Sequence, residues 1–172
     1  MKNVMSKFLF AALIVFSVTG FAHKAMAAEM KVAYVDVAVL FDDYQKTKDN
    51  DAELKVVGEQ KEAEREEKVK GIRALKDELV LLSDAAKEEK QEALDEKIRE
   101  LQEFENSVKQ DLGTRRNQLV REIFRDIDDV VQRYGERKGY DLIFHKRVLL
   151  YSTDKLDVTK EVLEELNKGY NK

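Results

Sequence analysis

The side chains most able to carry out chemistry are scarce in this chain. It contains no cysteine, and of its two histidines only His145 lies beyond residues 1–28. No glycine-rich phosphate loop and no histidine cluster with metal-ligand spacing is found. Carboxylates are abundant, but at this density on helical segments they are typical of a solvated face rather than of a general acid and base. We therefore predict no enzyme, no metal and no cofactor, with His145 in a turn.

The N-terminal segment reads as a secretory signal peptide. Lys2 and Lys7 precede an apolar run over residues 8–18, and Ala25-Met26-Ala27 has the small-x-small pattern of a cleavage site. A membrane anchor is the alternative, but the run is shorter than the roughly 20 apolar residues that span a bilayer. Cleavage after Ala27 or Ala28 would leave an exported protein.

Charge and composition exclude several classes of partner. The chain carries 31 Lys and Arg against 35 Asp and Glu, and three of the lysines fall in the leader. An acidic chain disfavours nucleic acid, which needs clustered cations, and gives no support for contact with acidic membranes or lipopolysaccharide. With no proline, no cysteine and 38% charged residues, the composition favours long helices over a compact globule.

A long helical hairpin is predicted between two strand-like segments. "KVAYVDVAVLF" (31–41) opens as a strand, and Asp36 then caps a short helix that carries Leu40, Phe41 and Tyr44. A first long helix is expected from an N-cap at Asn50 or Asp51 to about Leu82. A second follows an N-cap at Ser83 or Asp84 and continues to about Tyr134. Apolar residues recur every three or four positions along both.

Folding these helices antiparallel brings their apolar residues into register. Leu79 then lies opposite Leu94, Leu75 opposite Ile98, and Ile72 opposite Leu101. Coiled-coil packing along this seam predicts an arm about 50 Å long. Lys61 and Arg65 interrupt the seam where Gly58 and Gly113 lie at nearly the same height. We take these glycines as a candidate hinge, the alternative being that they are incidental.

The remainder forms a small β body. "YDLIF" and "VLLYS", on either side of "HKR", are expected to form a β-hairpin that lies beside the first strand. An end helix follows, with Asp157 as its N-cap and Val158, Val162, Leu163 and Leu166 as its apolar face. One helix and the base of the helical hairpin cannot both bury the apolar residues of this sheet and close its two edges. We therefore expect identical chains to close into a ring. The residues expected to build this shared body are Val32, Val35, Leu142, Phe144, Leu149 and Tyr151.

These segments together resemble the Skp/OmpH family of periplasmic chaperones. The resemblance covers nearly the whole chain after the leader and rests mainly on "KVAYVDVAVLF" and "YDLIFHKRVLLYSTDKLDVTKEVLEEL" (140–166). It implies an α+β fold, with a trimeric barrel-like β body and antiparallel coiled-coil arms around a cavity. It also implies an ATP-independent holdase in the periplasm, a homotrimer whose partners are unfolded outer-membrane proteins. This chain is acidic where the best-known members are strongly basic.

The predicted organisation is a signal peptide over 1–28, a trimerisation body over 29–50 and 120–172, and an arm over 51–119. Apolar arm residues that the seam does not use are the candidate client-binding positions: Val80, Leu81, Val108 and Leu112. Val108 and Leu112 are alternatively ordinary seam residues packed on the stems of Arg65 and Lys61. Two rival functions remain: a secreted coiled-coil spacer or envelope tether without clients, and an adaptor that recruits a folded partner through its tips.

Overall fold

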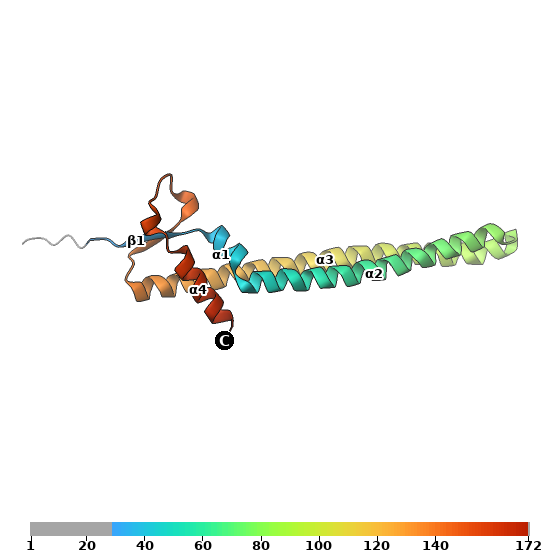
Figure 1. Ribbon diagram of the computed structural model, residues 1–172. Helices are drawn as coiled ribbons and strands as arrows, with labels where there is room; N and C mark the ends of the chain where they lie inside the picture. The colour runs from blue at the N-terminus through green and yellow to red at the C-terminus, as the bar shows by residue number, and fades with distance from the viewer. Residues whose placement is uncertain (1–28, 172) are drawn as a thin grey trace, which may run out of the picture.

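A computed structural model describes residues 29–171, and it consists of a small body from which one long helical hairpin projects (Figure 1). The predicted signal peptide lies outside the described residues. The hairpin is made of α2 (Gln45–Leu81) and α3 (Asp84–Lys138), and the body contains both strands and the two short helices. This arrangement confirms the predicted fold class of a long antiparallel helical hairpin on a small β part.

The sheet consists of two short parallel strands, β1 (Val32–Val35) and β2 (Leu142–His145). Val32 lies opposite Leu142, and Val35 lies opposite His145. Parallel strands need a long crossover connection, and here the whole arm is that crossover. The chain therefore leaves the sheet at one strand end and returns beside it more than a hundred residues later.

The predicted hairpin around "HKR" is wrong. Instead of turning into a third strand, the chain enters a 3₁₀ helix, η1 (Lys146–Val148), and the sheet has two strands in the described chain. The Nδ1 atom of His145 accepts a hydrogen bond from the backbone N–H of Arg147 at 2.9 Å, which caps η1. His145 was predicted in a turn, but it is the last residue of β2. A second short 3₁₀ helix, η2 (Asp154–Leu156), follows. The free edge of β1 is met instead by a bridge between Tyr34 and Asp157.

The short helix α1 (Val37–Asp43) begins as predicted, because the carboxylate of Asp36 accepts hydrogen bonds from the N–H groups of Ala38 and Val39. The predicted start of the next helix at Asn50 or Asp51 is wrong. Helix α2 begins at Gln45, directly after the buried Tyr44, and the polar residues 48–51 continue it. The buried side chains of Tyr44 and Thr47 keep the first turn of α2 packed against the core, so the polar residues that follow do not end the helix.

The turn at the tip and the end of α3 follow the expected helix signals. Ser83 is the N-cap of α3, and Gly139 ends that helix with φ of 68°, a left-handed conformation that glycine adopts without strain. Helix α4 (Thr159–Tyr170) follows the predicted end helix, but its N-cap is Val158 and not Asp157 as predicted. The carboxylate of Asp157, one residue earlier, accepts a hydrogen bond from the N–H of Thr159 at 2.9 Å.

The core lies where α1, α3 and α4 meet under the sheet. Its most deeply buried side chains are Leu40, Ile123, Ile127, Val162 and Leu166. The predicted apolar face of α4 is confirmed, since Val158, Val162 and Leu166 are buried and Leu163 packs at the edge of the cluster. Along the arm, Ile72 and Leu94 are buried in the seam. The predicted domain boundaries after residues 50 and 119 fall inside the continuous helices α2 and α3, and that division stays a prediction.

Candidate functional site

Metal-ligating side chains do not cluster in residues 29–171: no group of three or more His, Cys, Asp or Glu side chains among them is placed to hold a metal ion. Nor is any helix within this range long and apolar enough to cross a membrane. The candidate functional features are therefore surfaces: an apolar groove on the body, the tip of the arm and the sides of the arm.

The groove lies between β2 and the body end of α3. It has a volume of about 620 Å³, and its walls include Phe124, Val131, Leu142 and Phe144. Leu142 and Phe144 are 45% and 38% exposed on the outer face of the two-stranded sheet. An apolar hollow beside an uncovered strand is typical of a surface that another polypeptide covers.

The six residues predicted for the shared body differ in their surroundings. Val35 is buried in the core of this chain, and Val32 and Leu149 are half-buried. Leu142 and Phe144 line the groove, whereas Tyr151 is 84% exposed beyond η1. The exposed residues are the ones that a neighbouring chain could cover.

Phe124 belongs to this surface, and the sequence reasoning missed it. Its ring is 43% exposed and stacks on Phe41 at 5.3 Å between ring centroids. It follows Ile123 directly, so the seam pattern favoured its neighbours Ile123 and Ile127. A large aromatic residue one position outside a regular apolar stripe is the signal that could have found it.

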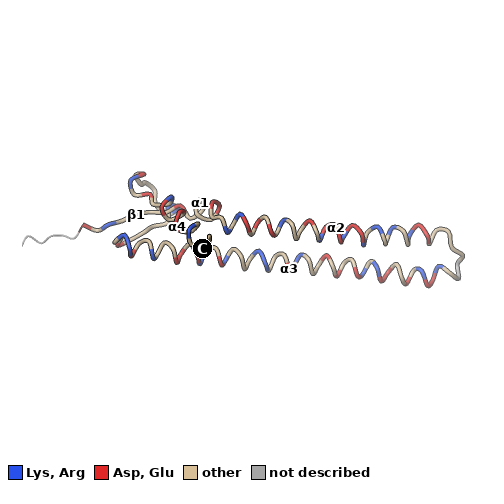
Figure 2. Tube along the Cα trace, turned by 60° about the horizontal axis from the view of Figure 1, so that its bottom comes forward, with Lys and Arg blue, Asp and Glu red and all other residues tan. Residues whose placement is uncertain are grey.

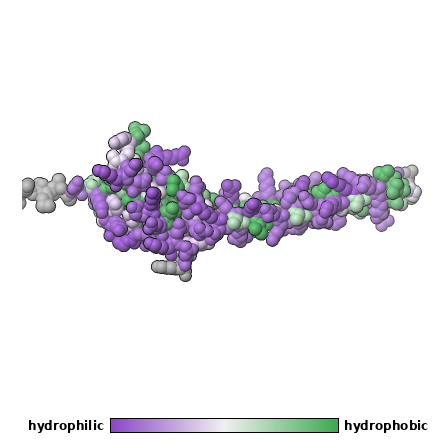
Figure 3. All heavy atoms as spheres, in the orientation of Figure 1, coloured by the Kyte–Doolittle hydropathy of each residue, from purple (hydrophilic) through white to green (hydrophobic). Residues whose placement is uncertain are grey.

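The tip of the arm exposes apolar side chains, as predicted. Val80 and Leu81 are 78% and 86% exposed. A shallow hollow beside them is lined by Leu79, Val80 and Gln91. In Figure 3 hydrophobic residues gather at this end of an otherwise largely hydrophilic arm. The tip is thus an exposed apolar surface at the end of a highly charged helical hairpin.

Acidic and basic residues are interspersed along both helices of the arm (Figure 2). Several ion pairs join α2 to α3: Glu53 pairs with Arg115, Arg65 with Glu105, and Glu78 with Lys90. The hydrogen bond to Glu105, together with the charge of Glu62, raises the pKa of Arg65. Such exposed pairs contribute little stability each, but they tie the helices together in antiparallel order.

The predicted interruption of the seam is filled by basic stems and one aromatic ring. The ammonium groups of Lys61 and Lys68 lie 5.4 and 5.3 Å from the centroid of the Phe104 ring. Val108 and Leu112 are half-buried on α3. Their intermediate burial fits both interpretations of these two residues, as seam residues packed on basic side chains and as client-binding positions. A Cβ atom at Gly58 or Gly113 would meet no atom within 4 Å.

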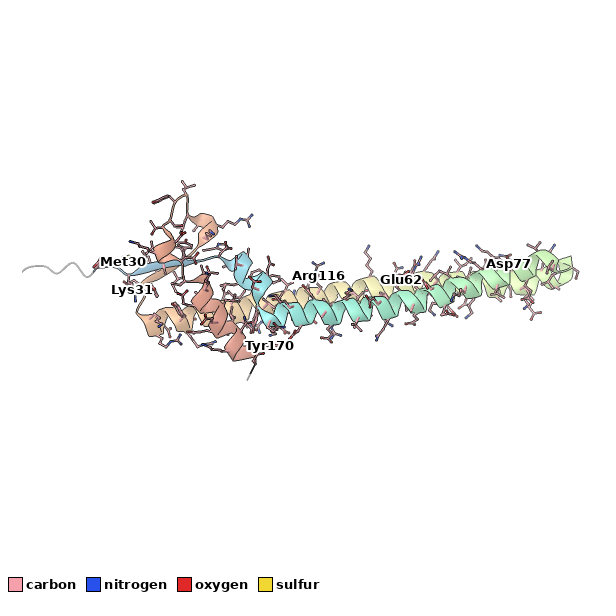
Figure 4. All side chains as sticks on the ribbon, in the orientation of Figure 1. Met30, Lys31, Glu62, Asp77, Arg116 and Tyr170 are labelled. Carbon is pink, nitrogen blue, oxygen red and sulfur yellow. The ribbon has the colours of Figure 1, made fainter. Side chains whose placement is uncertain are left out.

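The arm is fastened to the body by polar contacts at its base. Lys46 pairs with Asp126 at 2.8 Å, the hydroxyl of Tyr44 donates to Asp126 at 3.3 Å, and the N–H of Gln45 donates to the side chain of Asn167 at 2.8 Å. The labelled Tyr170 lies at the end of α4 beside this joint (Figure 4), and its ring meets Tyr44 edge-on. Burial, followed by the charge and hydrogen bond of Asp126, raises the pKa of Tyr44 to about 12.

Comparison with known proteins places these features in one family. The family described as "Outer membrane protein (OmpH-like)" matches residues 31–166. A crystal structure described as an OmpH-like outer membrane chaperone from Caulobacter crescentus superposes with a TM-score of 0.76. That match covers 83% of this chain and 86% of the other at 14% sequence identity, so it shows a shared fold. No match is found among curated proteins.

Proposed function

The chain belongs to the outer membrane protein (OmpH-like) family, and on that basis we propose that it is a periplasmic chaperone that holds unfolded outer-membrane proteins. In this proposal three copies of the chain form a trimer, and their arms enclose a cavity in which the client is kept from aggregating. The protein uses no ATP and carries out no reaction on the client. The main support is the family match, and the similar fold of a structure described as an outer membrane chaperone is consistent with it.

The arm supports a holding function through its chemistry. It is long and charged, and its exposed apolar side chains, such as Val80 and Leu81, are few. An unfolded barrel protein exposes many alternating apolar residues. Many weak contacts with such a chain add up through multivalency without one specific site, which is what a holder of varied clients needs.

The body supports assembly with identical chains. Leu142 and Phe144 are exposed on β2, which pairs with β1 alone in the part of the chain that the structure describes. Two-stranded sheets are unstable alone, and an uncovered apolar strand edge promotes association. A closed ring of three copies would cover the groove and leave the arms projecting.

Light scattering tests this proposal. A denatured outer-membrane porin is diluted from urea with and without the protein, in the absence of nucleotide. We expect a moderate excess of the protein to suppress the rise in scattering. Unchanged aggregation at several-fold excess would contradict holding and favour the rival function of a coiled-coil spacer or tether.

Sedimentation of the protein alone tests the assembly. We expect a trimer, or a concentration-dependent exchange with one, since the sheet edges need closure. A compact, monodisperse monomer at micromolar concentration would contradict it.

A further inference from the structure

One face of α3 runs from the body out along the arm. Near the body β2 packs against this face, so closely that a Cβ atom at Gly135 would lie 3.2 Å from the Cδ1 atom of Ile143. Val131 and Phe124, on the same face, line the groove. Because seven residues make about two helical turns, Asn117 and Gln110 continue the row beyond Phe124.

We call this continuation the amide stripe. Its residues lie three or four positions apart, and they are Asn106, Gln110, Gly113, Asn117, Val120 and Phe124. All are exposed except Val120, which is half-buried. None carries a charge, although 38% of the chain is charged; Lys109, Arg116 and Arg121 flank the row, and Glu103 and Asp128 lie at its two ends. Arg116, labelled in Figure 4, projects from the arm beside it.

The amides of the stripe have no partner within the described chain. Other glutamines bond locally: Gln91 donates to Asp95 at 3.0 Å and Gln132 to Glu136 at 3.5 Å. No such bond is formed by Asn106, Gln110 or Asn117 to any described residue. Each therefore presents an N–H donor pair and a carbonyl acceptor to its surroundings.

We propose that the amide stripe binds the backbone of an extended, unfolded polypeptide that lies along α3 on the arm, beyond the groove. This inference rests on the proposed holding function and names one surface that contributes to it alongside the exposed tip of the arm. Side-chain amides can donate to and accept from a peptide group whatever its side chain. Val120, within the stripe, offers apolar contact without selecting a sequence.

The charges on and around the stripe disfavour nucleic acid, acidic lipid and the charged arm of a second copy as ligands of this face. Nucleic acid or acidic lipid would need cations on the stripe itself, which has none. A charged side of a second copy's arm would leave its charges without partners against the stripe, at a high desolvation cost. An unfolded barrel segment exposes alternating apolar residues and uncharged peptide groups, so it can lie against the stripe without such a cost.

The proposal is tested by placing a charge at each of two glutamines that lie on different faces of α3. Gln110 lies in the stripe, whereas Gln118 is also exposed on α3 but lies outside the stripe. We compare Gln110→Glu and Gln110→Lys with Gln118→Glu and Gln118→Lys. The probe is a urea-denatured eight-stranded outer-membrane barrel carrying a fluorophore, diluted into each protein.

We expect both Gln110 variants to raise the dissociation constant by about threefold to tenfold, the range for losing one hydrogen bond in a partly desolvated contact. The Gln118 variants should stay within about twofold of the parent. If Gln110→Lys binds as tightly as the parent or tighter, the flanking cations hold the client and the stripe does not. Equal effects at both positions would overturn the proposal too.

A second pair of measurements separates the amides from mere neutrality and from helix stability. Gln110→Ala with Asn117→Ala removes the hydrogen-bonding groups, adds no charge and favours the helix. This double variant should bind the probe less tightly than the parent while its circular dichroism and sedimentation are unchanged. Parental affinity in the double variant would show that the amides make no bond to the client.

Because the chain has no cysteine, single cysteines with a photo-crosslinker can be placed at Asn117 and at Gln118. The barrel should crosslink more strongly from position 117, and equal yields would contradict the proposal. Absence of probe binding by the parent protein would instead reject the holding function itself.

Discussion

Asp36 shows how much one residue organises in this fold. Its carboxylate caps α1 and lies 3.3 Å from the ammonium group of Lys146, while its N–H donates to the hydroxyl of Thr159 at 2.9 Å. It thus joins the first strand, the first helix, η1 and α4. Partial burial raises the pKa of Asp36, but the N–H of Val39 and the ammonium of Lys146 outweigh this effect, and the pKa is lowered.

We predict that Asp36→Ala lowers the free energy of unfolding by about 1 kcal/mol, the usual cost of losing an N-cap. Asp36→Asn should lose less, because asparagine also caps. A lowered carboxyl pKa contributes stability above the unfolded value of about 3.9, and this contribution is lost as pH falls through the folded pKa. Urea unfolding at fixed protein concentration measures both effects. Equal stability of the alanine variant and the parent at neutral pH would refute the cap.

Tyr44 gives a prediction at the alkaline end. Its pKa is raised to about 12, whereas an unfolded tyrosine titrates near 10. The folded state therefore keeps a proton that the unfolded state loses between about pH 10 and 12, so stability falls as pH rises through this window. Tyr44→Phe should lose about 2 kcal/mol less than the parent over that range, measured by urea midpoints. Identical losses in both proteins would mean that Tyr44 ionises freely.

Helices with a regular apolar repeat could be predicted from the sequence, whereas boundaries and strands fixed by contacts with distant residues could not. Seam periodicity placed α2 and α3, and the apolar face of α4 placed the end helix. The start of α2 was missed because Tyr44 is fixed by packing against the core, which no local signal records. The third strand was predicted from Val148 to Ser152, residues with strong β propensity that have no strand partner in the described chain.

The candidate site was predictable to a similar extent. Val80 and Leu81 stood out because they lie next to the seam residues Leu79 and Leu82 near a turn. The groove did not, since it arises only when β2 packs on α3 near Gly135. Local patterns thus predict what one helix exposes, whereas hollows between distant segments need the fold.

The candidate hinge is an element-scale hypothesis. Gly58 and Gly113 lie within continuous helices, and each weakens its helix by about 1 kcal/mol relative to alanine. Because added Cβ atoms would meet no neighbour within 4 Å, Gly58→Ala with Gly113→Ala should fold normally. We predict a narrower distribution of distances between spin labels at Leu82 of the three copies. An unchanged distribution would show that the arms do not bend at these glycines.

At the scale of the whole molecule, the body and the arm have separable tasks. The deeply buried residues of the body, among them Leu40, Ile127 and Leu166, come from α1, the last part of α3 and α4. Among the described residues of the outer arm, Ile72 and Leu94 are buried, but less deeply, at 7% and 5% exposure. Assembly and holding should therefore depend on different parts of the chain.

We predict that replacing residues 72–101 by a short turn leaves the oligomer intact and abolishes holding. This deletion removes the exposed tip and the outer seam but keeps the core, the groove and the contacts of Tyr44, Lys46 and Asp126 at the arm base. Sedimentation should give the same number of copies as in the full chain, and porin aggregation should proceed as though no chaperone were present. If the shortened protein is monomeric, contacts between the arms hold the copies together, and the groove on the body is not the interface.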